Sequence, residues 1–171
     1  MKRSWRERRN VWHELYVNER KFDNRVLSPC VMQYTRHVPF IEYDITRFVQ
    51  EGANCLDILL GNGWFVPITE DVWSFHSAPW CHWEGTKLLC NVVADGRTVL
   101  KSDYSWKYRT TPICFNSLRN GEIYDARKEA APEEWHEVFC AMPPPGKLLK
   151  EDMEPCRVCE ELKPLSCKKV A

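Results

Sequence analysis

Nine cysteines are the first residues in this 171-residue chain whose spacing could support chemistry. Cys156 and Cys159 form a Cys-x-x-Cys pair, and Cys167 follows eight residues later. A zinc site needs a fourth ligand, yet no Cys or His lies between Cys140 and Cys156 or after Cys167. A redox pair would open a helix in a βαβ unit, whereas this pair follows a proline-rich run. We interpret most of the cysteines as buried free thiols, with a metal or redox centre as the alternative.

Carboxylates are the second group, because glycoside cleavage uses two carboxyl groups that face each other across a sugar bond. The candidates are Asp57, Asp103, Glu122 and Asp125. No spacing pairs them, and we interpret Glu122 and Asp125 as structural residues that close a turn or pair with neighbouring arginines. Motifs of P-loop proteins, zincins, serine hydrolases and dinucleotide-binding proteins are absent. The chemistry within this chain therefore predicts no enzyme activity of its own.

Aromatic rings and loop oxygens favour sugar binding instead. The chain has eight tryptophans, and those between residues 64 and 83 either form a stacking platform or cap the core beneath a long loop: Trp64, Trp73, Trp80 and Trp83. Calcium prefers carboxylate, amide and carbonyl oxygens, which Asp23, Asn24 and Asn62 could supply from predicted loops. The alternative is an ordinary turn at Asp23–Asn24 and a left-handed conformation at Asn62, between two glycines.

Composition excludes several other classes of protein. The chain has 24 Lys+Arg and 24 Asp+Glu, so a formal net charge of +0 removes the electrostatic argument for nucleic-acid binding. No apolar stretch is long enough for a membrane-spanning helix. Residues 1–11 are basic and lack a following apolar region, so we expect a flexible end, no secretory signal and a cytoplasmic location. The length fits one domain over residues 12–171.

Short alternating stretches predict an all-β fold. Period-two alternation predicts strands over residues 13–18 and 37–45, and an apolar run over residues 54–61 predicts a strand between sheets. Further strands are expected over residues 86–93, 97–101, 105–109 and 113–120. Residues 64–84 are aromatic without a period and predict a long packed loop. Turn signals about every ten residues indicate an antiparallel, jelly-roll-like β-sandwich.

Five segments, in this order, resemble the N-terminal β-sandwich of bacterial α-L-rhamnosidases. They are LYVNERKFDNRVLSP, PFIEYDITRFVQEGANCLDILLGNGWF, DGRTVLKSDYSWKY, RNGEIYDAR and PPPGKLLKEDMEPCRVCEELKP. Members of that family continue into an (α/α)₆ barrel that carries the catalytic carboxylates. The resemblance therefore implies an isolated or truncated N-terminal domain whose natural partner is that barrel.

The resemblance also implies a site. Some of these domains are similar to a carbohydrate-binding module that holds L-rhamnose through calcium, using an Asp-Asn pair, a downstream Asn and a Pro carbonyl. The matching residues are Asp23 and Asn24, Asn62, and Pro67, with Asn24, Asn62 and Pro67 as expected metal ligands and Trp64 as a further sugar contact. We expect a non-catalytic domain that binds an L-rhamnose-containing glycan or supports the catalytic barrel. The alternative is a purely structural interaction domain without a sugar site.

Overall fold

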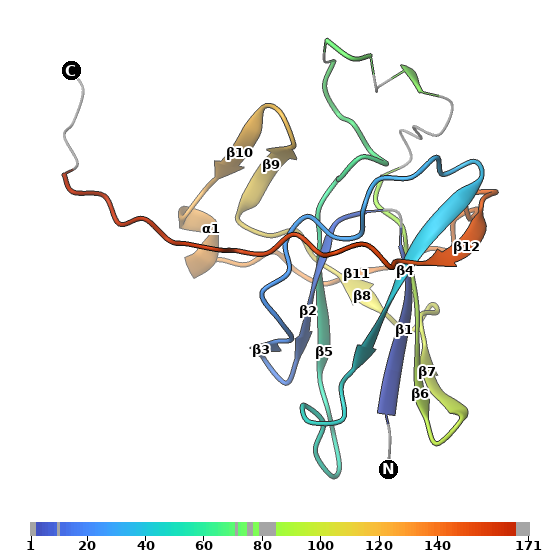
Figure 1. Cartoon of the computed structure of the whole chain (residues 1–171). Helices are drawn as coiled ribbons and strands as arrows, with labels where there is room; N and C mark the ends of the chain where they lie inside the picture. The colour runs from blue at the N-terminus through green and yellow to red at the C-terminus, as the bar shows by residue number, and fades with distance from the viewer. Residues whose placement is uncertain (1–2, 10, 71, 75–76, 79–84, 167–171) are drawn as a thin grey trace.

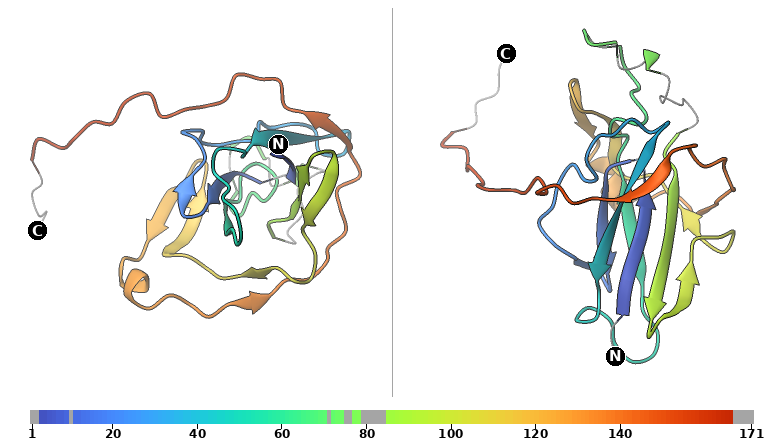
Figure 2. Two further views of the ribbon diagram at one scale, coloured as in Figure 1. Left: turned by 90° about the horizontal axis from the view of Figure 1, so that it is seen from below. Right: turned by 45° about the vertical axis from the view of Figure 1, so that its right-hand side comes forward.

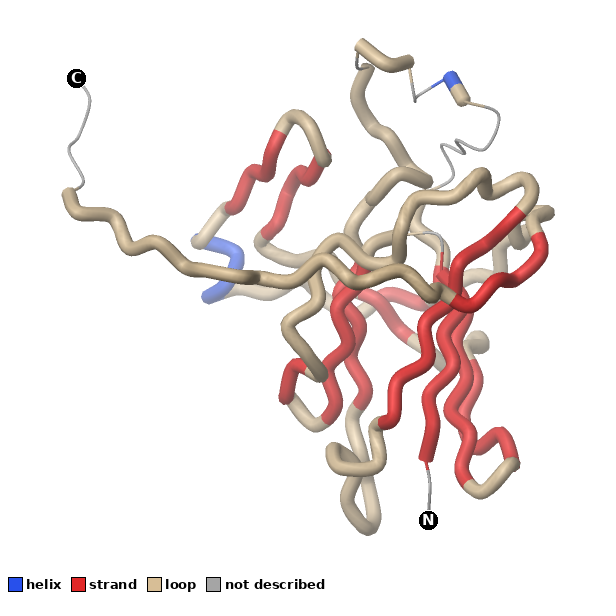
Figure 3. Tube along the Cα trace, viewed as in Figure 1, coloured by secondary structure: helices blue, strands red, loops and turns tan. Residues whose placement is uncertain are grey.

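The computed structural model describes residues 3–9, 11–70, 72–74, 77–78 and 85–166 (Figure 1). Its regular structure is mostly β, and the strands form several small sheets (Figure 3). Over these ranges the only α-helix is α1 (Arg127–Ala130). No helix in this part of the chain is long and apolar enough to cross a membrane. The predicted all-β class is confirmed at this level.

The largest sheet has five strands. In spatial order they are β12 (Lys147–Lys150), β4 (His37–Asp44), β1 (Arg3–Arg9), β6 (Leu88–Ala94) and β7 (Arg97–Lys101). Strand β12 runs parallel to β4, and the other neighbours are antiparallel. The predicted hairpin turn at Asp95–Gly96 joins β6 to β7.

The middle strand of this sheet comes from the segment that we expected to be a flexible basic end. Arg3–Arg9 form β1, which pairs with β4 on one side and β6 on the other. Backbone N–H and C=O groups pair across a sheet whatever side chains the residues carry. An arginine-rich segment can therefore lie between two strands even though its sequence shows no apolar alternation.

A second sheet has three strands, and two strand pairs lie outside both sheets. The three-stranded sheet contains β3 (Arg20–Lys21), β2 (His13–Val17) and β5 (Leu56–Leu60). The pairs are β9 (Ile113–Ser117) with β10 (Gly121–Tyr124), and β8 (Lys107–Tyr108) with β11 (His136–Glu137). Strand β5 lies at an edge of this sheet, and its side chains are half-buried or exposed. Leu56 and Ile58 pack against the buried cluster that includes Leu15 and Val17.

The main core joins the two larger sheets. Buried residues alternate along β2, and in β4 Pro39, Ile41 and Tyr43 alternate in the same way while Val38 is also buried, as expected for strands with one face turned inward. The cluster comprises Leu15, Val17, Ile41, Tyr43, Ile45, Cys90 and Val92. A second cluster of Val11, Tyr34, Phe65 and Val66 includes the beginning of the loop that follows β5.

The second half of the chain contributes little to this core. No residue from 95 to 166 is buried. Large apolar side chains in this half face solvent, including Tyr104, Trp135, Phe139, Met142, Leu162 and Leu165. The β9–β10 hairpin projects from the sheets, and the C-terminal segment crosses the molecule from β12 and then leaves it (Figures 1 and 2). Much apolar surface therefore remains uncovered.

Candidate functional site

A small cavity, partly open to solvent, lies between the loop after β5 and the β9–β10 hairpin. The loop lines it with Asn62, Gly63, Trp64, Val66, Pro67, Ile68 and Thr69. The hairpin lines it with Asn116, Ser117, Leu118 and Arg119. Of the residues that sequence reasoning selected for a sugar or metal site, the cavity thus brings together Asn62, Trp64 and Pro67.

The loop is fixed at its base by Trp12 and by its own apolar residues. The Gly61 N–H donates to the Trp12 carbonyl oxygen at 2.8 Å. Gly63 has a φ of +58°, and a Cβ there would lie 3.1 Å from the Trp12 nitrogen, so a glycine suits both the conformation and the space. Phe65 and Val66 are buried in the second core cluster. Asn62 and Trp64 are therefore presented from an anchored segment.

The hairpin is tied to the loop by side-chain hydrogen bonds. The Asn62 N–H donates to Oδ1 of Asn116 at 3.1 Å, and Asn62 Nδ2 donates to the Asn116 carbonyl oxygen at 3.0 Å. Asn120 Nδ2 donates to Oγ1 of Thr69 at 2.6 Å, and that oxygen lies 3.3 Å from Oγ of Ser117. Sequence reasoning missed Asn116 and Ser117, because no local pattern near them indicates contact with residues 62–69.

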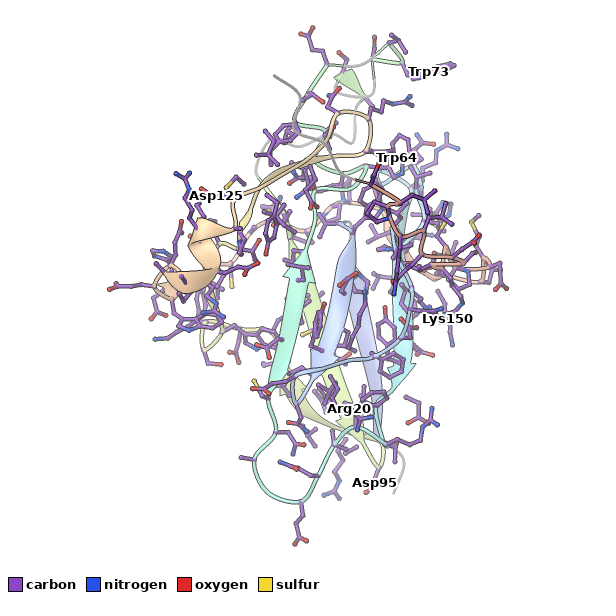
Figure 4. All side chains as sticks on the ribbon, turned by 90° about the vertical axis from the view of Figure 1, so that its left-hand side faces the viewer. Arg20, Trp64, Trp73, Asp95, Asp125 and Lys150 are labelled. Carbon is purple, nitrogen blue, oxygen red and sulfur yellow. The ribbon has the colours of Figure 1, made fainter. Side chains whose placement is uncertain are left out.

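Arg119 links the cavity to two tryptophans. Its guanidinium carbon lies 5.9 Å from the ring centroid of Trp64 and 5.9 Å from that of Trp73. Trp73, which is 66% exposed, lies towards the outer end of its loop, and Trp64 lies nearer the sheets (Figure 4). Trp64 also packs partly against the second core cluster, so it lines the cavity and covers the core at once. The two other candidate tryptophans, Trp80 and Trp83, lie outside the described residues.

Asp23 and Asn24 do not line this cavity. Asp23 forms an ion pair with Arg25, with 2.8 Å between Oδ2 and Nε, and its Oδ1 accepts the Arg25 N–H at 3.1 Å. Oδ1 of Asn24 accepts a hydrogen bond from Nη1 of Arg157 at 2.5 Å. These oxygens already face arginine donors, so the Asp23–Asn24 turn does not fit the calcium site that the resemblance implies.

The cysteines do not form a metal site in the part of the chain that the structure describes, where no group of three or more His, Cys, Asp or Glu residues could hold an ion. Among the described cysteines, Cys90 is buried at 2% exposure, but Cys55, Cys114, Cys140, Cys156 and Cys159 are exposed. The prediction of mostly buried thiols is therefore wrong. Most of the exposed ones belong to the second half of the chain, which contributes no buried residue.

Two of the candidate carboxylates, Asp125 and Asp103, form hydrogen bonds with residues two positions further along the chain. Asp125 lies beside α1 (Figure 4), 2.7 Å from Nη2 of Arg127, and these hydrogen bonds hold the pKa of Asp125 below its usual value. Asp103 accepts hydrogen bonds from Ser105, which likewise lower its pKa. None of the four carboxylates lines the cavity.

Similarity to known proteins identifies the domain. Residues 11–160 match the family described as the alpha-L-rhamnosidase N-terminal domain. The chain belongs to this family. An alpha-L-rhamnosidase of Formosa agariphila is 33% identical over 122 residues, which are 69% of this chain and 13% of that protein. The alpha-L-rhamnosidase of Streptomyces avermitilis is 32% identical over 123 residues, which are 70% of this chain and 12% of that protein.

Two solved structures resemble this rhamnosidase N-terminal domain closely. The alpha-L-rhamnosidase from Dictyoglumus thermophilum aligns with a TM-score of 0.78 and 30% identity, over 97% of this chain and 19% of that one. The Streptomyces avermitilis alpha-L-rhamnosidase, complexed with L-rhamnose, aligns with a TM-score of 0.77 and 26% identity, over 93% and 16%. The chain thus spans less than a fifth of these relatives, in which the domain is one part of a larger protein.

Proposed function

We propose that this chain is a non-catalytic, carbohydrate-binding domain of an α-L-rhamnosidase and that it binds an L-rhamnose-containing glycan in the cavity beside Asn62. The observation that carries the proposal is the meeting of an amide, an indole ring and a guanidinium group in one cavity, from Asn62, Trp64 and Arg119. The complex of the Streptomyces avermitilis relative with L-rhamnose supports this choice of sugar.

The cavity has the mixture of groups that a deoxy sugar requires. Rhamnose presents hydroxyl groups on its ring and an apolar methyl group at one end. Val66, Pro67 and Ile68 offer apolar surface to the methyl group, and the Trp64 ring offers its face to C–H groups. Asn116, Ser117 and Arg119 line the same space with an amide, a hydroxyl and a cation for the sugar hydroxyls.

Nuclear magnetic resonance tests where the sugar binds. In a ¹H–¹⁵N spectrum of the full chain, L-rhamnose should shift the side-chain amide signal of Asn62 and the indole N–H of Trp64. The side-chain amide of Asn91, which lies on β6 of the five-stranded sheet and not in the cavity, serves as the control. L-Fucose, another 6-deoxy sugar, tests selectivity. Equal shifts at Asn62 and Asn91, or none at Asn62 at saturating L-rhamnose, would contradict the proposed site.

A second role, support of the remaining enzyme, is favoured by the apolar surface of the second half. No residue from 95 to 166 is buried, and Phe139 and Met142 are among the most exposed apolar side chains. Large exposed apolar side chains in such number are typical of an interface. We infer that it faces other parts of the full rhamnosidase, with the catalytic barrel as the expected partner.

Self-association of the isolated chain tests this second role. The chain should associate at high concentration, and a double F139S/M142S substitution should shift light scattering towards the monomer. The matched control is K147S, an exposed position on β12. A fully monomeric chain at all concentrations would contradict the role.

We infer that the fold of this domain is a jelly-roll-like β-sandwich, which is compatible with both roles. We infer that the five-stranded and three-stranded sheets are its two layers. Leu15 and Val17 of β2 share one buried cluster with Ile41 of β4 and Cys90 of β6, so side chains from both sheets meet in a single core. The cavity then lies beyond one end of β5, where loops of the sandwich gather.

A further inference from the structure

Residues 156–158, here named the clamp, pair with the chain just after Asn24. Arg157 forms an antiparallel bridge with Arg25. The Val26 N–H donates to the Cys156 carbonyl oxygen at 3.0 Å, and the Val158 N–H donates to the Asn24 carbonyl oxygen at 3.4 Å. Beyond the clamp the chain leaves the molecule (Figure 2). The clamp is therefore the last attachment of the C-terminal segment among the contacts found in the described residues.

Side chains reinforce this attachment at the Asp23–Asn24 turn. Nη1 of Arg157 donates to Oδ1 of Asn24 at 2.5 Å. On the other side of the turn, the Asp23 carboxylate pairs with Arg25, with 2.8 Å between Oδ2 and Nε. Arg25 also places its guanidinium over the ring of Tyr43, 5.6 Å from the centroid, so its position is fixed by the core. The Asn24 amide oxygen thus accepts from a guanidinium group, and the Asp23 carboxylate forms an ion pair with another.

The charges of this cluster oppose a divalent cation. The Asp23 carboxylate pairs with Arg25, and Arg157 contacts the neighbouring Asn24, so the side chains of Asp23, Arg25 and Arg157 sum to +1. A calcium ion takes six to eight oxygen ligands and favours carboxylates. At this turn it would have to displace the Arg157 guanidinium and approach that of Arg25.

We propose that Arg157 is the resident cation of the Asp23–Asn24 turn, where it holds the C-terminal segment, and that this domain binds no calcium there. It follows that the cavity beside Asn62 binds L-rhamnose without a metal, and this consequence rests on the proposed function. The interaction between Arg157 and Asn24 is charge-assisted and partly open to solvent, so its contribution to stability is modest.

Thermal unfolding of the full chain tests whether Arg157, and not calcium, occupies the Asp23–Asn24 turn. With calcium chloride at about 100 times its dissociation constant, a site in the folded chain would raise Tm by about 5–10 °C. We expect the wild-type Tm to be the same, within about 1 °C, in millimolar calcium chloride and in EDTA. We expect R157Q to lower Tm by about 2–4 °C and to speed cleavage by chymotrypsin after the exposed Leu162. R97Q, at an exposed position on β7, is the matched control and should do neither.

Three results would overturn the inference. The first is a calcium-dependent rise in the wild-type Tm that N24A abolishes. The second is an R157Q variant that matches R97Q in both Tm and proteolysis. The third is L-rhamnose binding that occurs in calcium and disappears in EDTA. Absence of L-rhamnose binding under both conditions would instead overturn the proposed function and leave the assignment of Arg157 intact, so the two failures are distinguishable.

Discussion

Replacing Asn116 with alanine removes the acceptor that ties the β9–β10 hairpin to the loop after β5. Oδ1 of Asn116 accepts the Asn62 N–H at 3.1 Å, in a half-buried position. A typical hydrogen bond contributes about 1 kcal/mol net, and a buried donor left without a partner costs about 1–3 kcal/mol. Since this N–H is only half-buried, we expect a loss of about 1.5 kcal/mol, which lowers the Tm of a chain of this size by about 3–6 °C.

The conservative variant separates this hydrogen bond from other consequences of the change. N116D keeps an oxygen in the same position and also keeps the backbone carbonyl that accepts Asn62 Nδ2. Calorimetric unfolding should therefore show a lowered Tm for N116A and a Tm close to wild type for N116D. E122Q, an exposed change on β10 of the same hairpin, should leave Tm unchanged.

Among these variants, N116A should bind L-rhamnose most weakly. A hairpin released from Asn62 no longer holds Arg119 beside Trp64, so N116A should bind L-rhamnose about tenfold more weakly, which corresponds to about 1.4 kcal/mol. An N116A protein that unfolds at the wild-type temperature and binds sugar with wild-type affinity would refute the role of this hydrogen bond.

Three further changes test the core, a close backbone contact and a thiol. Leu15 is 3% exposed, so L15A should cost about 2–5 kcal/mol, measured by urea unfolding, and a loss below 1 kcal/mol would contradict its place in the core. A Cβ at Gly146 would lie 2.4 Å from the carbonyl oxygen of Tyr34, so G146A should lower Tm clearly, and an unchanged Tm would contradict that contact. Burial, and then the carboxylate of Glu151, raise the pKa of Cys30 from 9.0 to about 11. Its contribution to stability should be complete below pH 9 and lost as the pH rises towards 11. E151Q should speed iodoacetamide labelling of Cys30 at pH 8, and an unchanged rate by mass spectrometry would contradict the effect of that carboxylate.

The central strands could be predicted because their signal is local. Leu15 and Val17, like Ile41 and Tyr43, are separated by one residue, and that alternation alone reports a strand with one buried face. Strand β1 could not be predicted, because its arginines show no alternation and its position depends on pairing with two distant strands.

Only the wall of the cavity formed by the loop after β5 could be predicted from the sequence. Asn62 was recognisable between two glycines, in a segment that also matches the family pattern. Asn116 lies 54 residues away in sequence and meets Asn62 through the path of an irregular chain, which no local pattern encodes. Arg157, 133 residues from Asn24, was missed for the same reason. Reasoning from single motifs thus identified one wall of the cavity and did not identify the contact between Asn24 and Arg157.

Isothermal titration of the full chain with L-rhamnose, in EDTA, tests sugar binding in the cavity most directly. Wild type and E122Q should release binding heat with equal affinity, and R119Q, an exposed change on the cavity wall, should weaken binding by about tenfold or more. Unfolding curves measured on the same samples confirm that R119Q is folded. Equal affinity in wild type and R119Q, or no heat from the wild-type chain, would contradict binding of L-rhamnose in this cavity.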